Sequence, residues 1–136
     1  MTQTQTIFTN EYATLMYHPE NRIVHHIFHK PIGGEAFRQV LDTGLDTLKQ
    51  HGASKWLSDD RQNAALPLED TMWAITNWAP RVLAAGWKSW ALIVPDSVSA
   101  RINMAEFIND YGEKGVRIMI FADPNEAQQW LEKQAN

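Results

Sequence analysis

Trp90-Ala91-Leu92-Ile93-Val94 is the most apolar run in the chain and decides the fold class. Five consecutive apolar residues without alternation are typical of a strand that is buried on both faces, as in a parallel sheet. We therefore predict a central strand here, and the segments on either side of it indicate what surrounds it.

After this strand, the pattern of apolar residues changes twice more. Residues 98–111 carry apolar side chains at helical spacing, and Gly115 is suited to end that helix. Residues 116–121 predict another buried strand. The run Asp123-Pro124-Asn125-Glu126 offers an N-cap followed by a first-turn proline, so a final helix is expected to begin there. Its inward-facing residues are predicted to be Ala127, Trp130 and Leu131.

Before the central strand, residues 69–79 predict a helix with Met72, Ile75 and Ala79 on one side. Pro80 cannot continue a regular helix without loss of a hydrogen bond, so we expect a break or kink there, with Pro80 starting a further short turn of helix. Further upstream, residues 55–58 predict a short strand that ends in the polar loop 59–63.

The first third of the chain predicts a hairpin and a helix. Residues 12–17 and 22–28 are rich in β-branched and aromatic side chains, and His18-Pro19-Glu20-Asn21 between them favours a turn. A helix is expected from Gly34 up to a stop at Gly52. Its apolar stripe consists of Phe37, Val40, Leu41, Leu45 and Leu48.

This order of elements predicts an α/β fold: a mixed β-sheet with an N-terminal antiparallel hairpin, then alternating helices and parallel strands, with four to five helices. A chain of 136 residues is the size of one domain, so we expect a single domain over residues 1–136. The polar residues 1–6 are expected to form a flexible tail.

Composition narrows the function classes. The formal net charge of −4 argues against a nucleic-acid partner, because binding to phosphates needs a basic surface. The chain has no cysteine, which excludes disulfides, thiolate catalysis and cysteine-ligated metals. No apolar stretch reaches the ~18 residues of a membrane span, and no secretory signal is visible. We therefore expect a cytoplasmic protein without a cofactor.

Several stretches together form a wider pattern: the start of the hairpin, residues 56–61, the helix with Trp73, residues 86–95 and residues 121–131. In these stretches the sequence resembles the SpoIIAA-like branch of the STAS superfamily, named for sulphate transporters and anti-sigma-factor antagonists. The resemblance covers nearly the whole chain. It implies a four- or five-stranded sheet with helices on one face, similar also to lipid-carrying SEC-fourteen-type domains.

One feature of that family is missing. Its phosphorylated regulators carry a serine where a helix starts after a central strand, whereas the corresponding residues 66–71 contain only Thr71 as a hydroxyl. The resemblance therefore does not imply regulation by serine phosphorylation. What it does imply is a binding or regulatory module.

The loop Asp59-Asp60-Arg61 follows a predicted strand, at the edge where open α/β sheets bind ligands. Asp96 and Asp123 follow the next two strands, so three acidic loops could hold Mg²⁺ or assist phosphoryl transfer. The alternative is structural: Asp96 and Asp123 suit helix N-caps, and Arg61 can neutralise one of the paired aspartates. We favour this alternative.

The histidines give no metal site. His25 and His29 share a face of their strand but lie about 13 Å apart, while His26 faces the other way. No serine or cysteine nucleophile completes a catalytic triad. We expect these histidines to be partly exposed residues of the sheet.

The chain has six tryptophans, and four of them fall within residues 73–90. Trp73 and Trp78 fall off the stripe of Met72, Ile75 and Ala79, so that one helix face cannot bury them all. Tryptophan suits cores, interfaces and apolar pockets alike. The candidate residues for binding a ligand or partner are Asp59, Asp60, Arg61, Trp73, Trp78 and Trp87.

Three functions remain open from the sequence. The first is a non-enzymatic binding or regulatory module that forms a homodimer or binds another protein through the tryptophan-rich helix and the loop after the Trp56 strand. The second is a carrier of a small apolar or lipid-like ligand. The third is a metal-dependent enzyme or phosphoacceptor that uses the Asp59-Asp60-Arg61 loop. We favour the first.

Overall fold

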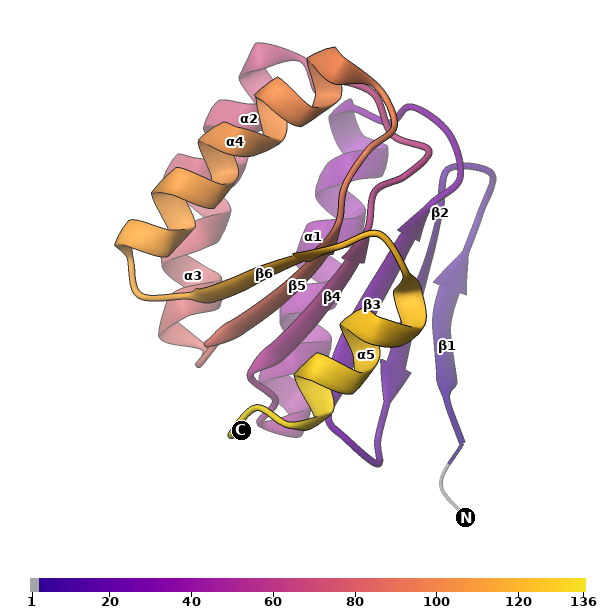
Figure 1. The fold of residues 1–136 in the computed structure, drawn as a ribbon, viewed down its shortest axis with the longest axis vertical. Helices are drawn as coiled ribbons and strands as arrows, with labels where there is room; N and C mark the ends of the chain where they lie inside the picture. Colours follow the sequence, from indigo (N-terminus) through magenta and orange to yellow (C-terminus); the bar gives the residue numbers. More distant parts are fainter. Residues whose placement is uncertain (1–2) are drawn as a thin grey trace.

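The computed structural model describes residues 3–136 (Figure 1). Six strands form a single sheet in the order β1-β2-β3-β4-β5-β6. The first three strands pair antiparallel, and β3 to β6 pair parallel, which confirms the predicted fold class. The elements are β1 (Gln5–Thr9), β2 (Ala13–His18), β3 (Ile23–Phe28), α1 (Gly34–His51), β4 (Lys55–Asp59), α2 (Leu68–Trp73), the π-helical turn η1 (Ala74–Trp78), α3 (Ala79–Ala84), β5 (Ser89–Ile93), α4 (Val98–Glu113), β6 (Arg117–Phe121) and α5 (Pro124–Glu132).

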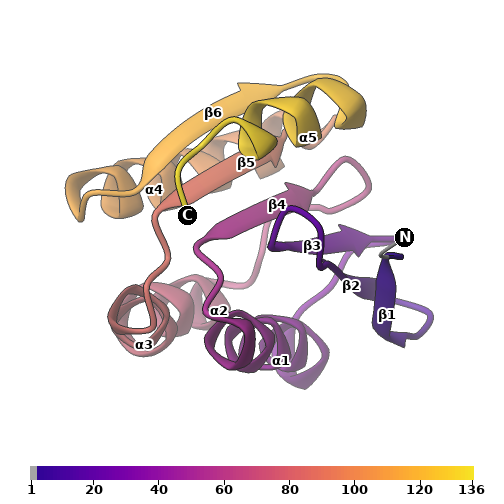
Figure 2. The ribbon, with the colours of Figure 1, turned by 90° about the horizontal axis from the view of Figure 1, so that it is seen from below.

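Helices lie on both faces of this sheet. Because parallel strands are joined by right-handed crossovers and each new strand adds to the same edge, α1, α3 and α4 pack on one face. Figure 2 shows α1 and α3 on one side of the central strands and α5 on the other. The smaller core beneath α5 consists of Ile23, Leu57, Ala91, Ile93, Ala127 and Leu131. The family resemblance implied helices on one face only. That expectation is wrong, because α5 covers the other face.

Helix α1 follows the sequence prediction closely. It begins at Gly34 and ends at Gly52, whose φ of 61° is left-handed and whose N–H bonds the carbonyls of Leu48 and Lys49. All five residues of the predicted stripe are buried against the sheet. The stripe places α1 directly over β2 and β3.

Gly44 lies in the middle of α1, where helix and sheet approach most closely. A Cβ atom there would overlap the six-membered ring of Trp56, which is fully buried on β4. We expect Gly44→Ala to lower the free energy of unfolding by about 1–3 kcal/mol, because an overpacked ring must move. Alanine's better helix propensity offsets part of this loss. Urea unfolding followed by circular dichroism measures the change.

The matched control is Gly112→Ala in α4. A Cβ there would lie 3.8 Å from Ile118 Cδ1, an ordinary contact distance. This variant is expected to be stabilised by about 0.4–1 kcal/mol. Equal stability of the Gly44 variant and the unsubstituted protein would contradict the close packing described for Trp56.

The helix that carries Pro80 continues without interruption but changes its geometry, and α3 begins at Ala79 with Pro80 in its first turn. Residues 74–78 form a π-helical turn that leads directly into α3, and Ala79 N–H bonds the carbonyl of Ala74. The wider turn accommodates a residue that has no N–H and would clash with a regular preceding turn. It also shifts the phase of the helix: Met72 is 49% exposed, whereas Ala74 and Trp78 are buried. The predicted stripe was therefore wrong at Met72 and Trp78.

The ends of the sheet also differ from expectation. Strand β6 was predicted to be buried, but it is an edge strand, and Met119 and Ile120 are about half exposed. Strand β1 adds a sixth strand beyond the four or five implied by the resemblance. It includes residues 5 and 6 of the expected tail, while residues 1 and 2 lie outside the described residues. Within residues 3–136, no helix combines the length and apolar character needed to cross a membrane.

Candidate functional site

A cavity of about 50 Å³ lies between the sheet and the layer formed by α1, α3 and α4. One water needs roughly 10–15 Å³ of such space, so the cavity has room for a compact molecule of about three or four non-hydrogen atoms. Residues of β3, β4, β5, α1, η1, α4 and the β4–α2 and α3–β5 loops line it. They are His26, Phe28, Phe37, Leu41, Trp56, Ser58, Asp60, Asn63, Leu66, Trp78, Trp87, Trp90, Met104, Phe107 and Tyr111.

Aromatic rings form most of the wall. The ring centroids of Trp87 and Tyr111 are 5.2 Å apart, and those of Trp56 and Trp78 are 5.4 Å apart, both in edge-to-face geometry. Such pairs stabilise beyond the area they bury, and they hold each ring in one orientation. The wall is therefore a closely packed set of rings in fixed relative orientation in this structure.

Each indole N–H of the wall donates to an acceptor within the protein. Buried polar groups need such partners, and none of the four remains open to a ligand. The bonds run from Trp56 to His26 Nδ1 (3.0 Å), from Trp78 to the Leu41 carbonyl (2.8 Å), from Trp87 to the Ser89 carbonyl (3.1 Å) and from Trp90 to Ser58 Oγ (2.7 Å). The rings consequently offer apolar faces and edges to the cavity.

The polar part of the cavity is a hydrogen-bonded chain of three side chains. Trp56 Nε1 donates to His26 Nδ1, and His26 Nε2 lies 2.7 Å from Asp60 Oδ1. A ring nitrogen that accepts a hydrogen bond carries no proton, so the proton of His26 sits on Nε2 and points at Asp60. His26 is then the neutral tautomer, and Asp60 Oδ1 is the acceptor.

The second carboxylate oxygen of Asp60 has no such partner. Asp60 is 3% exposed, and among residues 3–136 no group donates a hydrogen bond to Oδ2, which is not fully buried and keeps some contact with solvent. Asp60 belongs to the wall of the cavity. An acceptor oxygen is thus available to an occupant.

Asp59 lies on the opposite face of the sheet from Asp60. Its carboxylate receives two hydrogen bonds from the Arg61 side chain, at 2.9 and 2.7 Å. Burial alone would raise the pKa of Asp59, but these hydrogen bonds and the charge of Arg61 outweigh it and hold the pKa below its usual value. The predicted loop therefore contributes to two separate pairs, Asp59 with Arg61 and Asp60 with His26. These pairs lie on opposite faces of the sheet and cannot bind the same ligand.

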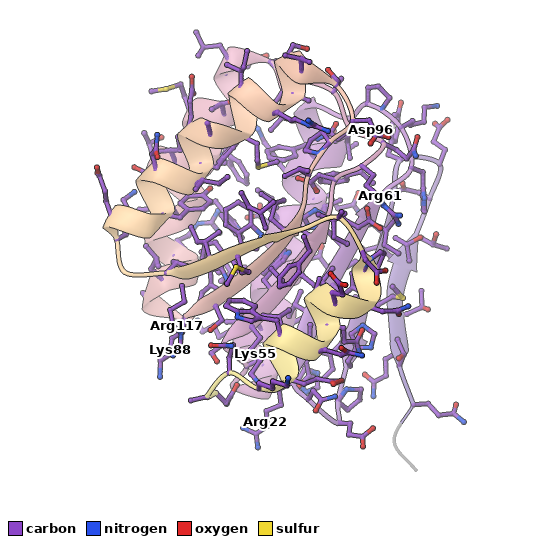
Figure 3. All side chains as sticks on the ribbon, in the orientation of Figure 1. Arg22, Lys55, Arg61, Lys88, Asp96 and Arg117 are labelled. Carbon is purple, nitrogen blue, oxygen red and sulfur yellow. The ribbon has the colours of Figure 1, made fainter. Side chains whose placement is uncertain are left out.

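Arg61 is also the point where the three acidic loops meet. Figure 3 shows Arg61 and Asp96 near each other at the carboxyl ends of the parallel strands, and Asp123 adds to the negative charge around the guanidinium. The side chain that caps α4 is Ser97 rather than Asp96, whereas Asp123 caps α5 as predicted. No group of three metal-ligating side chains occurs within the described residues.

The structure brings three of the six predicted site residues together. Asp60, Trp78 and Trp87 line the cavity, whereas Asp59 and Arg61 do not. Trp73 is partly buried at the edge of the core, where its ring contacts the guanidinium of Arg38 at 5.1 Å. It does not reach the cavity.

Other residues of the cavity were not predicted. His26 was expected to be partly exposed, as was His25, but both are buried and that expectation was wrong. The signal was present in β3, where Val24, His26 and Phe28 alternate toward the larger core. Tyr111 is likewise buried, and burial raises the pKa of its hydroxyl, which therefore stays protonated.

Thr71, the one hydroxyl considered for phosphorylation, is fully buried. It accepts a hydrogen bond from Asn103 Nδ2 at 3.1 Å and lies near the Pro67 carbonyl. These contacts tie α2 to α4. A kinase has no access to this hydroxyl in the folded protein.

The chain matches no protein-family model, and neither a curated protein nor a solved structure is significantly similar to it.

Proposed function

We propose that this protein binds a small, largely apolar molecule in the aromatic cavity and acts without catalysing a reaction. The observation that carries the proposal is the cavity wall, which combines closely packed aromatic rings with an available acceptor oxygen on Asp60. Concave, mostly apolar sites with few polar groups are typical of small-molecule binding. The proposed binding site is therefore a partly open cavity at the core, not the outer face of the tryptophan-rich helix.

The size of the cavity favours a compact ligand over a lipid. A volume of about 50 Å³ has no room for an acyl chain. The resemblance to the SpoIIAA-like branch of the STAS superfamily supports a regulatory use of such binding. A homodimer and a cytoplasmic location stay predictions from the sequence, and the split between Asp59 and Asp60 gives the metal-dependent alternative no support.

Thermal unfolding in the presence of compact molecules, both neutral and charged, tests the proposal. A ligand that binds only the folded state raises Tm in proportion to its occupancy. We expect at least one molecule of about three to five non-hydrogen atoms to do so. Native mass spectrometry of freshly purified protein would show whether a natural ligand is retained.

A matched pair of methionine variants assigns the effect to the cavity. Met104 lines the cavity, whereas Met72 is exposed on α2. Met104→Phe fills the space with a larger apolar side chain and should abolish the stabilisation, while Met72→Phe should leave it unchanged. Stabilisation that survives in the Met104 variant would place the ligand elsewhere.

A further inference from the structure

We propose that the preferred ligand is a small organic ammonium ion, an amine in its protonated form that donates an N–H to Asp60 Oδ2. This inference rests on the proposed function, because it names the chemical class for the same cavity. Three observations carry it: the net charge of the polar chain, the free acceptor oxygen, and the rings that surround the remaining space.

The first observation is an uncompensated negative charge. The hydrogen bond from Trp56 keeps His26 neutral, so the pair of His26 and Asp60 carries the full charge of the carboxylate. A proton on His26 Nδ1 would point at the Trp56 N–H, so two donors would face each other without an acceptor. Within residues 3–136, no lysine or arginine forms an ion pair with Asp60, and Arg61 is held by Asp59.

A buried charge of this kind is unfavourable unless it is paired. The neutral N–H of His26 satisfies one oxygen and part of the charge. A cation in the cavity would supply the rest, and the acidic chain as a whole, with a net charge of −4, favours the approach of cations.

The second observation is the supply of acceptor oxygens. Asp60 Oδ2 accepts no hydrogen bond from the described residues, and Ser58 Oγ accepts only the Trp90 N–H and has capacity for another. All four indole N–H groups are already used. Two donors also line the cavity, the Ser58 hydroxyl and Asn63 Nδ2, and neither has an acceptor among the described residues. An ammonium ion donates to Asp60 Oδ2 and matches its charge, which a carboxylate or phosphate does not.

The third observation is the arrangement of the rings. Trp87 lies 5.6 Å from Trp78, 5.7 Å from Trp90 and 5.2 Å from Tyr111, measured between ring centroids. Cations bind favourably within about 6 Å of an aromatic centroid, most strongly where water is excluded. The alkyl groups of an ammonium ion would contact these same faces.

Isopropylammonium and propan-2-ol make a matched pair of probes, since they share shape and number of non-hydrogen atoms and differ in charge. NMR titration at neutral pH and constant ionic strength gives both dissociation constants. We expect the cation to bind at least about tenfold tighter, because a charge-assisted hydrogen bond replaces a neutral one. Equal affinities would overturn this inference and leave the proposed function standing, whereas no binding of either probe would remove both.

Asp60→Asn keeps the acceptor for His26 and removes the charge, so it should abolish the preference for the cation. Asp59→Asn is the matched control, because it removes the neighbouring carboxylate on the opposite face, and it should retain the preference. A preference that persists in the Asp60 variant would overturn the assignment.

Tetramethylammonium tests the same point without a variant. It carries the charge but no N–H, so it cannot donate to Asp60 Oδ2. We expect it to bind at least about tenfold more weakly than isopropylammonium. Equal binding would show that the rings alone select the cation and would overturn the hydrogen bond to Asp60.

Discussion

Replacing Trp78 by alanine is expected to lower the free energy of unfolding by about 3–5 kcal/mol, the usual cost of removing a buried indole. Trp78 is buried among Trp56, Trp87 and Tyr111 and donates to the Leu41 carbonyl of α1. Because whole-domain stability is typically about 5–15 kcal/mol, the variant should be close to unfolding at room temperature. Urea denaturation followed by far-UV circular dichroism measures the loss.

Trp73 is the control for this prediction. It lies five residues earlier, is only partly buried, and packs its ring against Phe37 and Arg38 at the edge of the core. Trp73→Ala should cost about 1–2 kcal/mol, in the range of ordinary substitutions. If the two variants were equally destabilised, the shift in helix phase caused by η1 would not determine which indole enters the core.

Acid should destabilise the protein through His25, the second large expected effect. Burial, followed by the neighbouring His18 and His26, lowers the pKa of His25 from 6.5 to about 3, although Asp59 acts in the opposite direction. In the unfolded chain His25 binds a proton below about pH 6.5, while the folded protein does not until about pH 3. The unfolded state therefore binds more protons in this window.

Stability should consequently fall by about 1.4 kcal/mol per pH unit as pH decreases from 6.5 toward 3, with no contribution from His25 above that window. Urea midpoints measured across this range give the slope. His25→Gln should flatten it, whereas His29→Gln on the exposed end of the hairpin should not. An unchanged slope in the His25 variant would mean that other groups cause the acid loss.

The fold was predictable because its signals are local. The stripe of α1, the Gly52 stop and the turn at 18–21 each fix a helix or strand within a few residues of sequence. The predicted burial of β6 was wrong because an apolar run alone does not reveal how much of a strand is covered by its neighbours. The predicted buried stripe between α2 and α3 was wrong because a π-helical turn changes the helical periodicity on which that prediction depends.

The candidate site was only partly predictable for a different reason. Trp78 and Trp87 were singled out by residue type and Asp60 by its place after a predicted strand, but their cavity is assembled from strands and helices far apart in the sequence. His26 lies 34 positions from Asp60, and no spacing rule connects them. The pairing depends on the parallel register of β3 and β4, in which His26 lies opposite Ser58.

The strand order has a consequence for how the chain is made. Each strand is hydrogen-bonded only to its immediate predecessor and successor in the sequence. During synthesis from the amino end, a new strand can add to the edge that the previous one has just formed, and none has to be inserted between two earlier strands. Each parallel pairing still spans a whole helical connection, and pairings of this kind form slowly. The sheet can nevertheless be extended in the same direction as translation, one strand at a time.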